Sequence, residues 1–77
     1  MHQVRLFAAA ADAAGTEVAS SSAASVAELR DELSARFGAE FARVLGQCSL
    51  LVDGARTDDG PLPAGARIDV LPPFAGG

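Results

Sequence analysis

The sequence predicts an α+β domain in which a mixed sheet of four to five strands packs on one main helix and a second, short helix. The chain has 77 residues, the size of a single small domain. Apolar and polar residues alternate near both ends, in "QVRLFA" and "ARIDVL", as they do in half-buried strands. Between these runs, apolar residues recur every three or four positions from Val26 to Phe37, which is typical of one helix face.

The N-terminal region is expected to form two short strands joined by a long connection. Residues 3–8 form the first strand, with Arg5 and Phe7 on the face opposite its aliphatic residues. The alanine-rich run that follows favours a helix by propensity, but Gly15 interrupts it, so we expect a loop or one frayed turn. Residues 16–20 can then return as the second strand.

The clearest local signal begins at Ser25. Ser25 and Glu28 form a capping box, in which each side chain accepts a hydrogen bond from the backbone near the other. The apolar stripe described above follows, and Gly38 stands where a glycine commonly ends a helix. Residues 39–46 predict a second, short helix that turns its apolar side chains to the core.

The C-terminal region predicts two more strands. Residues 49–52 form one, and Asp53–Gly54 is a strong hairpin signal directly after it. A turn-rich segment leads to the last strand, residues 66–71. The expected order is therefore strand–strand–helix–helix–strand–strand. The expected core consists of Val4, Leu6, Phe7, Val18, Val26, Leu29, Leu33, Phe37, Phe41, Val44, Leu45, Leu50, Leu51, Val52, Leu62, Ile68, Val70 and Leu71.

Charge limits the classes of partner. The formal net charge is −4 and the isoelectric point is about 4.6. Nucleic acids and anionic membranes are therefore not expected as partners, because both need clustered Lys and Arg. A basic protein surface would suit the chain better. The sequence shows neither a signal-peptide layout nor an apolar run of membrane-spanning length, so a cytoplasmic location is expected.

Few side chains suggest catalysis or metal binding. Cys48 is the only cysteine, which excludes a disulfide framework, and its apolar context predicts packing. His2 lies close to a fraying end with no expected partner, so it is neither a credible ligand nor a credible base. Asp58 and Asp59 resemble a solvated turn more than a metal site, which needs more convergent ligands. We expect no bound metal or cofactor.

The C-terminal residues 72–77, "PPFAGG", form a segment that we call the tail. Pro72 and Pro73 have no N–H to donate, so the sheet ladder should stop there and leave residues 1–71 as the folded domain. In an extended conformation the tail would reach roughly 18 Å. Gly76 and Gly77 have no Cβ, so the last peptide can enter a narrow channel and adopt whatever φ that channel requires.

These residues together resemble the ubiquitin-like β-grasp sulfur carriers, and among them the small subunits of molybdopterin synthase most closely. The matching stretches are "VRLFA", "SVAELRDELSARF", "VDG", "LPAGARIDVLPP" and the final "PPFAGG". The resemblance spans nearly the whole chain, and the final stretch is its most specific part. The first loop departs from the family pattern, since alanine stands where the family often has charged residues.

The resemblance implies a chemistry for Gly77. A ubiquitin-activating-like adenylyltransferase would use ATP to adenylate the terminal carboxylate of Gly77, and a persulfide sulfur would displace AMP to leave a thiocarboxylate. That sulfur would be delivered to cyclic pyranopterin monophosphate held on the molybdopterin synthase large subunit, in a hetero-oligomer of the two subunits. The chain would then be the sulfur-donor subunit of a sulfurtransferase, with no catalytic residue of its own.

Partner binding is expected at the tail and beside it, at Gly76, Ala75, Phe74, Pro73 and Phe7. Phe74 would either be an aromatic anchor for the partner or fold back onto its own sheet, and the two prolines, which carry it away from the core, favour the anchor. Phe7 is either a core residue or part of an exposed apolar patch. Three arginines, Arg5, Arg56 and Arg67, either line the same docking face or are solvated charges.

Three alternatives remain open from the sequence. The chain could be a thiocarboxylate carrier for another pathway, such as thiamin thiazole, cysteine or tRNA thiolation. It could be a ubiquitin-like modifier whose Gly77 forms an isopeptide bond with a lysine on a target protein. It could also be a β-grasp interaction module with an inert tail. All six basic side chains are Arg, so lysine-linked chains of this protein with itself are impossible.

Overall fold

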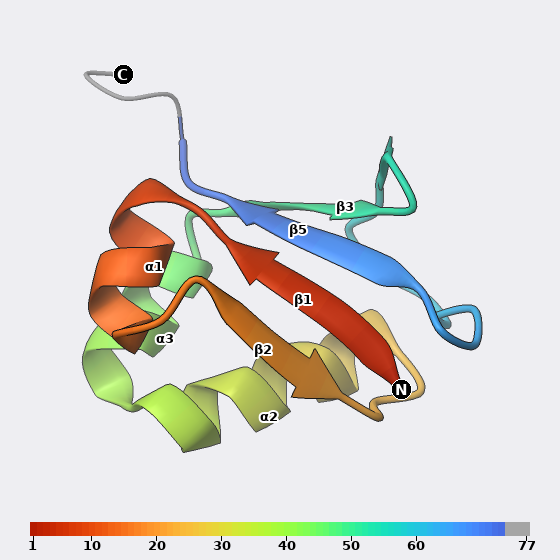
Figure 1. Ribbon diagram of the computed structural model, residues 1–77, viewed down its shortest axis with the longest axis horizontal. Coiled ribbons are helices and arrows are strands. Elements are labelled where there is room, and N and C mark those ends of the chain that lie inside the picture. Colours follow the sequence, from red (N-terminus) through yellow and green to blue (C-terminus); the bar gives the residue numbers. More distant parts are fainter. Residues whose placement is uncertain (74–77) are drawn as a thin grey trace.

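The computed structural model describes residues 1–73 and shows five strands and three helices (Figure 1). The strands form one sheet in the order β2-β1-β5-β3-β4. β1 and β5 are parallel, and the other neighbours are antiparallel. The elements are β1 (His2–Leu6), α1 (Ala8–Ala14), β2 (Val18–Ser21), α2 (Val26–Phe37), α3 (Ala39–Leu45), β3 (Ser49–Val52), β4 (Ala55–Arg56) and β5 (Arg67–Leu71).

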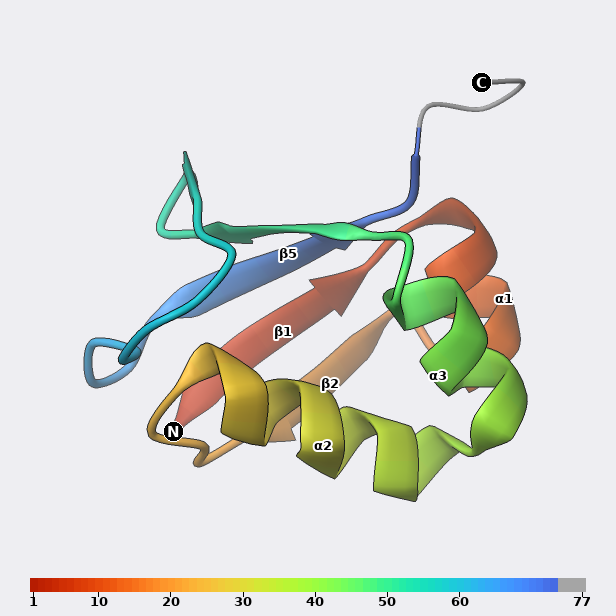
Figure 2. The same ribbon diagram turned by 180° about the vertical axis from the view of Figure 1, so that it is seen from behind.

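The helices cover one face of the sheet and leave the other face open (Figures 1 and 2). Burial alternates along β1, β3 and β5, with every second residue buried against the helices. The core lies between the sheet and the helices, as the sequence predicts. Its largest fully buried side chains are Phe41, Leu29, Leu33, Leu45, Leu50, Ile68, Val4, Val26 and Val70. No helix within residues 1–73 is long and apolar enough to cross a membrane.

The expected loop after the first strand is wrong, because residues 8–14 form α1. Gly15 ends this helix instead of preventing it: its φ is 76°, and its N–H donates to the Ala11 carbonyl oxygen at 2.9 Å. A left-handed glycine at this position is a common helix C-terminus. The helix also buries Ala10 completely, so packing adds to the helix propensity of the alanines.

The ends of α2 follow the local signals in the sequence. Ser25 Oγ accepts from the Glu28 N–H at 3.2 Å, as the capping box predicts. The Glu28 carboxylate accepts from the Ala24 N–H at 3.0 Å, one residue earlier than the standard box. Gly38 has a φ of 98° and separates α2 from α3. The Asp53–Gly54 turn is confirmed as well, with φ values of 50° and 88° between β3 and β4.

Four expectations about single residues are wrong. Leu51 and Leu71, expected in the core, are half-buried on the open face, because they alternate with the buried residues of β3 and β5. Val18 is 58% exposed instead of being in the core, because it pairs with Arg5 and both lie on the open face. His2 is not frayed: it starts β1, is buried, and lies between two backbone groups. Its Nδ1 accepts from the Ala66 N–H at 3.1 Å, so its Nε2–H donates to the Ala23 carbonyl oxygen at 2.6 Å.

Candidate functional site at the base of the tail

The tail begins at the end of β5, the middle strand of the sheet. β5 is hydrogen-bonded to β1 on one side and β3 on the other. The last contact on the β1 side is the Phe7 N–H, which donates to the Val70 carbonyl oxygen at 3.3 Å. Pro72 is half-buried and Pro73 is exposed. Since proline has no N–H, the ladder cannot continue past Leu71 through these two residues.

Of the predicted partner-binding residues, the structure describes Pro73 and Phe7. Phe74, Ala75, Gly76 and Gly77 lie outside the described residues, so their roles remain predictions. Phe7 is half-buried and directly precedes α1, where β1 ends beside the end of β5. The sequence left open whether Phe7 is a core residue or part of an exposed apolar patch. Its half-buried position lies between these two alternatives.

Phe7 belongs to a small group of side chains, Arg5, Phe7 and Asp69, which we call the Arg5 cluster. The Arg5 guanidinium carbon lies 5.4 Å from the centre of the Phe7 ring, within the range of a cation–π contact. Arg5 Nε–H donates to Asp69 Oδ1 at 3.1 Å. The Asp69 side chain is 16% exposed and that of Arg5 is 48% exposed, so the guanidinium reaches solvent while the carboxylate beneath it is largely covered.

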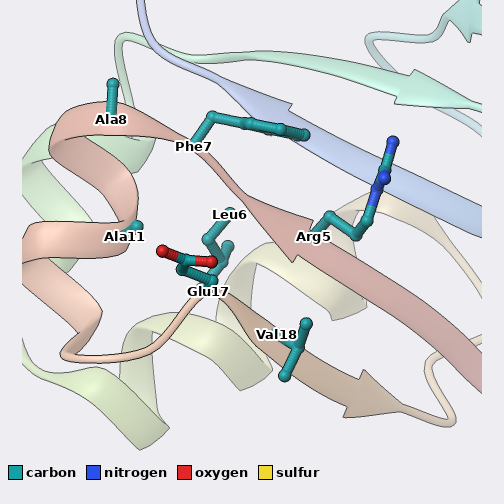
Figure 3. Close-up of a pocket in the computed structure, with 7 residues that line it drawn as sticks. All are labelled: Arg5, Leu6, Phe7, Ala8, Ala11, Glu17 and Val18. Carbon is teal, nitrogen blue, oxygen red and sulfur yellow. The ribbon is translucent and has the colours of Figure 1, made fainter.

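A pocket of about 280 Å³ adjoins this cluster, between the end of β1, the first turn of α1 and the start of β2 (Figure 3). Five of its lining residues are apolar, including Phe7 and the exposed Val18, and two are charged, Arg5 and Glu17. In the close-up, the Arg5 guanidinium and the Glu17 carboxylate point away from each other. The pocket therefore combines an apolar lining with one cation, Arg5, and one anion, Glu17.

Three arginines lie on the open face, a position that is compatible with both interpretations from the sequence, a docking face and solvated charges. Arg5 and Arg67 occupy the exposed positions of β1 and β5. Arg56 on β4 is paired with Leu51 on β3, and Leu51 is paired in turn with Asp69 on β5. Paired residues of neighbouring strands lie on the same face of a sheet, so Arg56 also lies on the open face. Arg56 Nε lies 3.5 Å from Asp58 Oδ1 in an exposed ion pair, whereas Arg67 forms no ion pair within residues 1–73.

Other candidate groups do not form a reactive centre. Cys48 is buried, and its Sγ–H donates to the Val44 carbonyl oxygen at 3.2 Å. Burial raises the pKa of the Cys48 thiol, and the nearby Arg30 charge opposes this only in part. No group of three or more His, Cys, Asp or Glu within residues 1–73 could hold a metal ion. The Cys48 environment fits the packing role predicted from the sequence.

Sequence reasoning did not find Asp69 or the pocket. Arg5 and Asp69 are 64 positions apart, and they meet because β1 and β5 pair in parallel with these two residues in register. Apolar and polar residues alternate in both terminal strands. If the parallel pairing of these strands had been assumed, this alternation would have placed Arg5 and Asp69 on the same face. The pocket depends on α1, which the sequence analysis did not expect.

A parallel pair of terminal strands, a helix across one face and a C-terminal strand in the centre of a mixed sheet make this a ubiquitin-like β-grasp domain. The chain belongs to the ThiS family, whose model matches residues 4–77. It is thus a sulfur carrier of the ThiS family. A search of curated proteins gave no significant match.

Solved structures agree with this assignment. SAMP1 from Haloferax volcanii is 26% identical, with a TM-score of 0.79, over 99% of this chain and 98% of that chain. A second crystal structure, of H. volcanii small archaeal modifier protein 1, is 25% identical with a TM-score of 0.77, over 95% and 97%. A complex of subunits 1 and 2 of molybdopterin-converting factor from Helicobacter pylori contains a chain that is 28% identical with a TM-score of 0.73, over 99% and 97%.

Proposed function

We propose that this chain is the small subunit of molybdopterin synthase and carries sulfur as a thiocarboxylate on Gly77. The carrying observation is the position of β5: the middle strand of the sheet leads into two prolines and a Gly-Gly end. The similarity to a chain in the H. pylori complex supports this choice of pathway, and it supports a large-subunit partner in a hetero-oligomer.

The proposed chemistry starts from a carboxylate, which is a poor electrophile at neutral pH. A ubiquitin-activating-like adenylyltransferase first joins the Gly77 carboxylate to the α-phosphate of ATP, and pyrophosphate leaves. A protein persulfide then attacks the acyl carbon and AMP leaves, which gives an acyl disulfide. A thiol reduces that disulfide and releases the Gly77 thiocarboxylate, which donates its sulfur to the pterin precursor on the large subunit.

The folded domain contributes binding and presentation to this sequence of steps. The ladder on both sides of β5 holds the base of the tail, and Pro72 and Pro73 direct the chain out of the sheet. Gly76 and Gly77 add no side-chain bulk where the partner must close around the acyl group. ATP belongs to the activating enzyme in this proposal, and the carrier binds no cofactor.

The decisive experiment is intact mass measurement after incubation with ATP, a persulfide donor, a thiol and the ubiquitin-activating-like enzyme of the same organism. We expect the mass gain of one oxygen replaced by sulfur, and no gain in a variant lacking Gly77. An unmodified wild-type chain, with the enzyme active on another carrier, would contradict the proposal. Adding the large subunit and the pterin precursor then tests the pathway, because only a molybdopterin synthase subunit should return to the unmodified mass.

A second candidate is a protein modifier, which the similarity to small archaeal modifier protein 1 favours. In that case the Gly77 acyl group would form an isopeptide bond with a lysine of another protein. The two functions differ in the product: a modifier yields a covalent conjugate that survives thiol treatment, whereas a sulfur carrier yields a free chain. Denaturing electrophoresis of a tagged chain from cells, with a Gly77 deletion as the control, separates them.

A further inference from the structure

β2 lies at one edge of the sheet, so its outer side has no neighbouring strand (Figure 1). In an antiparallel pair, successive residues point their N–H and C=O groups alternately toward the partner strand and away from it. The carbonyl oxygen of Glu17, the residue before β2, accepts from the Leu6 N–H at 2.9 Å and so points toward β1. The backbone groups of Val18 and Ser20 therefore point outward, where the strand of another chain would pair with them.

The side chains of β2 do not protect this edge. Proteins commonly protect an edge strand by a charged side chain, a proline, a bulge or a very short strand. β2 has the sequence VASS, without charge or proline, and its register with β1 is continuous from Val18 to Ser21. Val18 is also 58% exposed. The opposite edge differs, because β4 has two residues and is protected by its shortness.

Thr16 occupies both outward groups of Val18. Its Oγ1–H donates to the Val18 carbonyl oxygen at 3.1 Å, and the same oxygen accepts from the Val18 N–H at 3.3 Å. A threonine hydroxyl can do this because it both donates and accepts. One side chain thus occupies a donor and an acceptor that a second strand would need for pairing.

Arg36 reaches from α2 to the outward carbonyl of Ser20. Its Nη1–H donates to that oxygen at 2.9 Å, and its Nη2 is paired with Glu32, one turn earlier in the helix. The Glu32 carboxylate also accepts from the Ser21 Oγ–H at 2.6 Å, and Ser21 is buried. Arg36 is therefore held by contacts that begin at a buried side chain of β2 itself.

We propose that Thr16 and Arg36 close the free edge of β2 against strand addition, and that a second copy of this chain pairs with this edge when both are removed. Two identical edge strands can pair about a twofold axis, because each offers the same groups to the other. β2 suits such pairing, since it has no like charges that would repel each other across the axis. The inference does not depend on the proposed function.

Sedimentation equilibrium of the full chain over a range of concentrations tests this inference. We expect the wild type to be monomeric. The double variant Thr16→Val with Arg36→Ala should form a dimer, with association at least about tenfold tighter than that of the wild type, because backbone groups that were bonded within the chain become available to a second strand.

The matched control is the double variant Thr57→Val with Arg43→Ala. Thr57 Oγ1–H donates to the Ala55 carbonyl oxygen at 3.0 Å, two positions away as in Thr16, but beside the two-residue β4. Arg43 is an exposed arginine on α3 that is paired with Glu40. The control removes the same chemical groups away from β2, so it should sediment as the wild type does.

A third variant separates pairing at the edge from a general gain in stickiness. Adding Ser20→Pro to the first double variant removes the outward N–H and should restore the monomer, because proline is tolerated where the N–H of an edge strand faces solvent. Circular dichroism of the same samples shows whether each variant is folded. If the double variant is unfolded, Thr16→Val alone, which removes a single hydroxyl, should still dimerise more tightly than Thr57→Val alone.

Two results would overturn the inference. The first is equal association of the folded Thr16 variants and their Thr57 controls. The second is a dimer that persists after Ser20→Pro, since pairing would then not use the free edge of β2.

Discussion

Ala8, the residue at which the chain turns from β1 into α1, has a backbone conformation that glycine should hold better. Its φ is 50°, in the left-handed region that residues with a Cβ rarely adopt. The conformation is needed because Phe7 is still extended, with a φ of −122° and a ψ of 148°, and α1 begins at the next residue. This turn positions Phe7 next to Arg5 and the base of the tail.

The expected effect of Ala8→Gly is a gain in stability. A left-handed conformation costs an L-residue about 1–2 kcal/mol, and glycine removes that cost. Glycine also makes the unfolded chain more flexible, which lowers the free energy of unfolding by about 0.5–1 kcal/mol. The free energy of unfolding should therefore rise by about 0.5–1 kcal/mol, which corresponds to roughly 2–8 °C in Tm for a domain of this size. Ala8 is exposed, so no core packing is lost.

Ala9→Gly is the matched control. Ala9 is exposed and helical, and it is not among the described residues with positive φ. Its replacement should lower the free energy of unfolding by about 1 kcal/mol. Urea denaturation followed by circular dichroism measures both variants. Opposite signs support the reasoning, whereas an equal loss in the two variants would show that Ala8 does not hold a left-handed conformation in solution.

Two further predictions concern buried groups. His2→Ala should lower the free energy of unfolding by about 2–3 kcal/mol, because the Ala66 N–H and the Ala23 carbonyl both lose their buried partner. A loss below about 0.5 kcal/mol in urea denaturation would refute the conclusion that both ring nitrogens of His2 form hydrogen bonds. Cys48 should react with a thiol reagent far more slowly in the folded chain than in urea, since its pKa is raised by burial. Because the folded pKa exceeds the unfolded one, its contribution to stability is complete below the ordinary thiol pKa and is lost as pH rises through the folded value. Cys48→Ala should flatten the alkaline fall in Tm, and an unchanged slope would count against this linkage.

Local signals determined which parts of the fold could be predicted. The ends of α2 depend on Ser25 and Gly38, whose effects act within one turn and are therefore visible in the sequence. Gly15 gave an equally local signal, but it marks the end of a helix as readily as a break. What decides between the two is the burial of Ala10 in the core, a contact with distant residues that composition cannot show.

The candidate site divides in the same way. The end of β5 at Leu71 was predictable because the prolines that follow act through their own backbone, whereas the roles of residues 74–77 stay predictions. Arg5 and Asp69 were not, because their contact depends on the parallel pairing of β1 and β5. The antiparallel pairing of β1 and β2 explains Val18, which the sequence analysis assigned to the core because it is aliphatic. Its register with Arg5 places it on the open face instead.

The position of β5 suits the proposed function, in which a small domain presents Gly77 to its partners. An edge strand can be peeled from a sheet by breaking one ladder, but β5 is paired with both β1 and β3. A partner that pulls on the tail must therefore break two ladders before the base moves. Pro72 and Pro73 fix where pairing ends. For the proposed function this fixed starting point matters, because that proposal requires Gly77 to reach the active site of each partner.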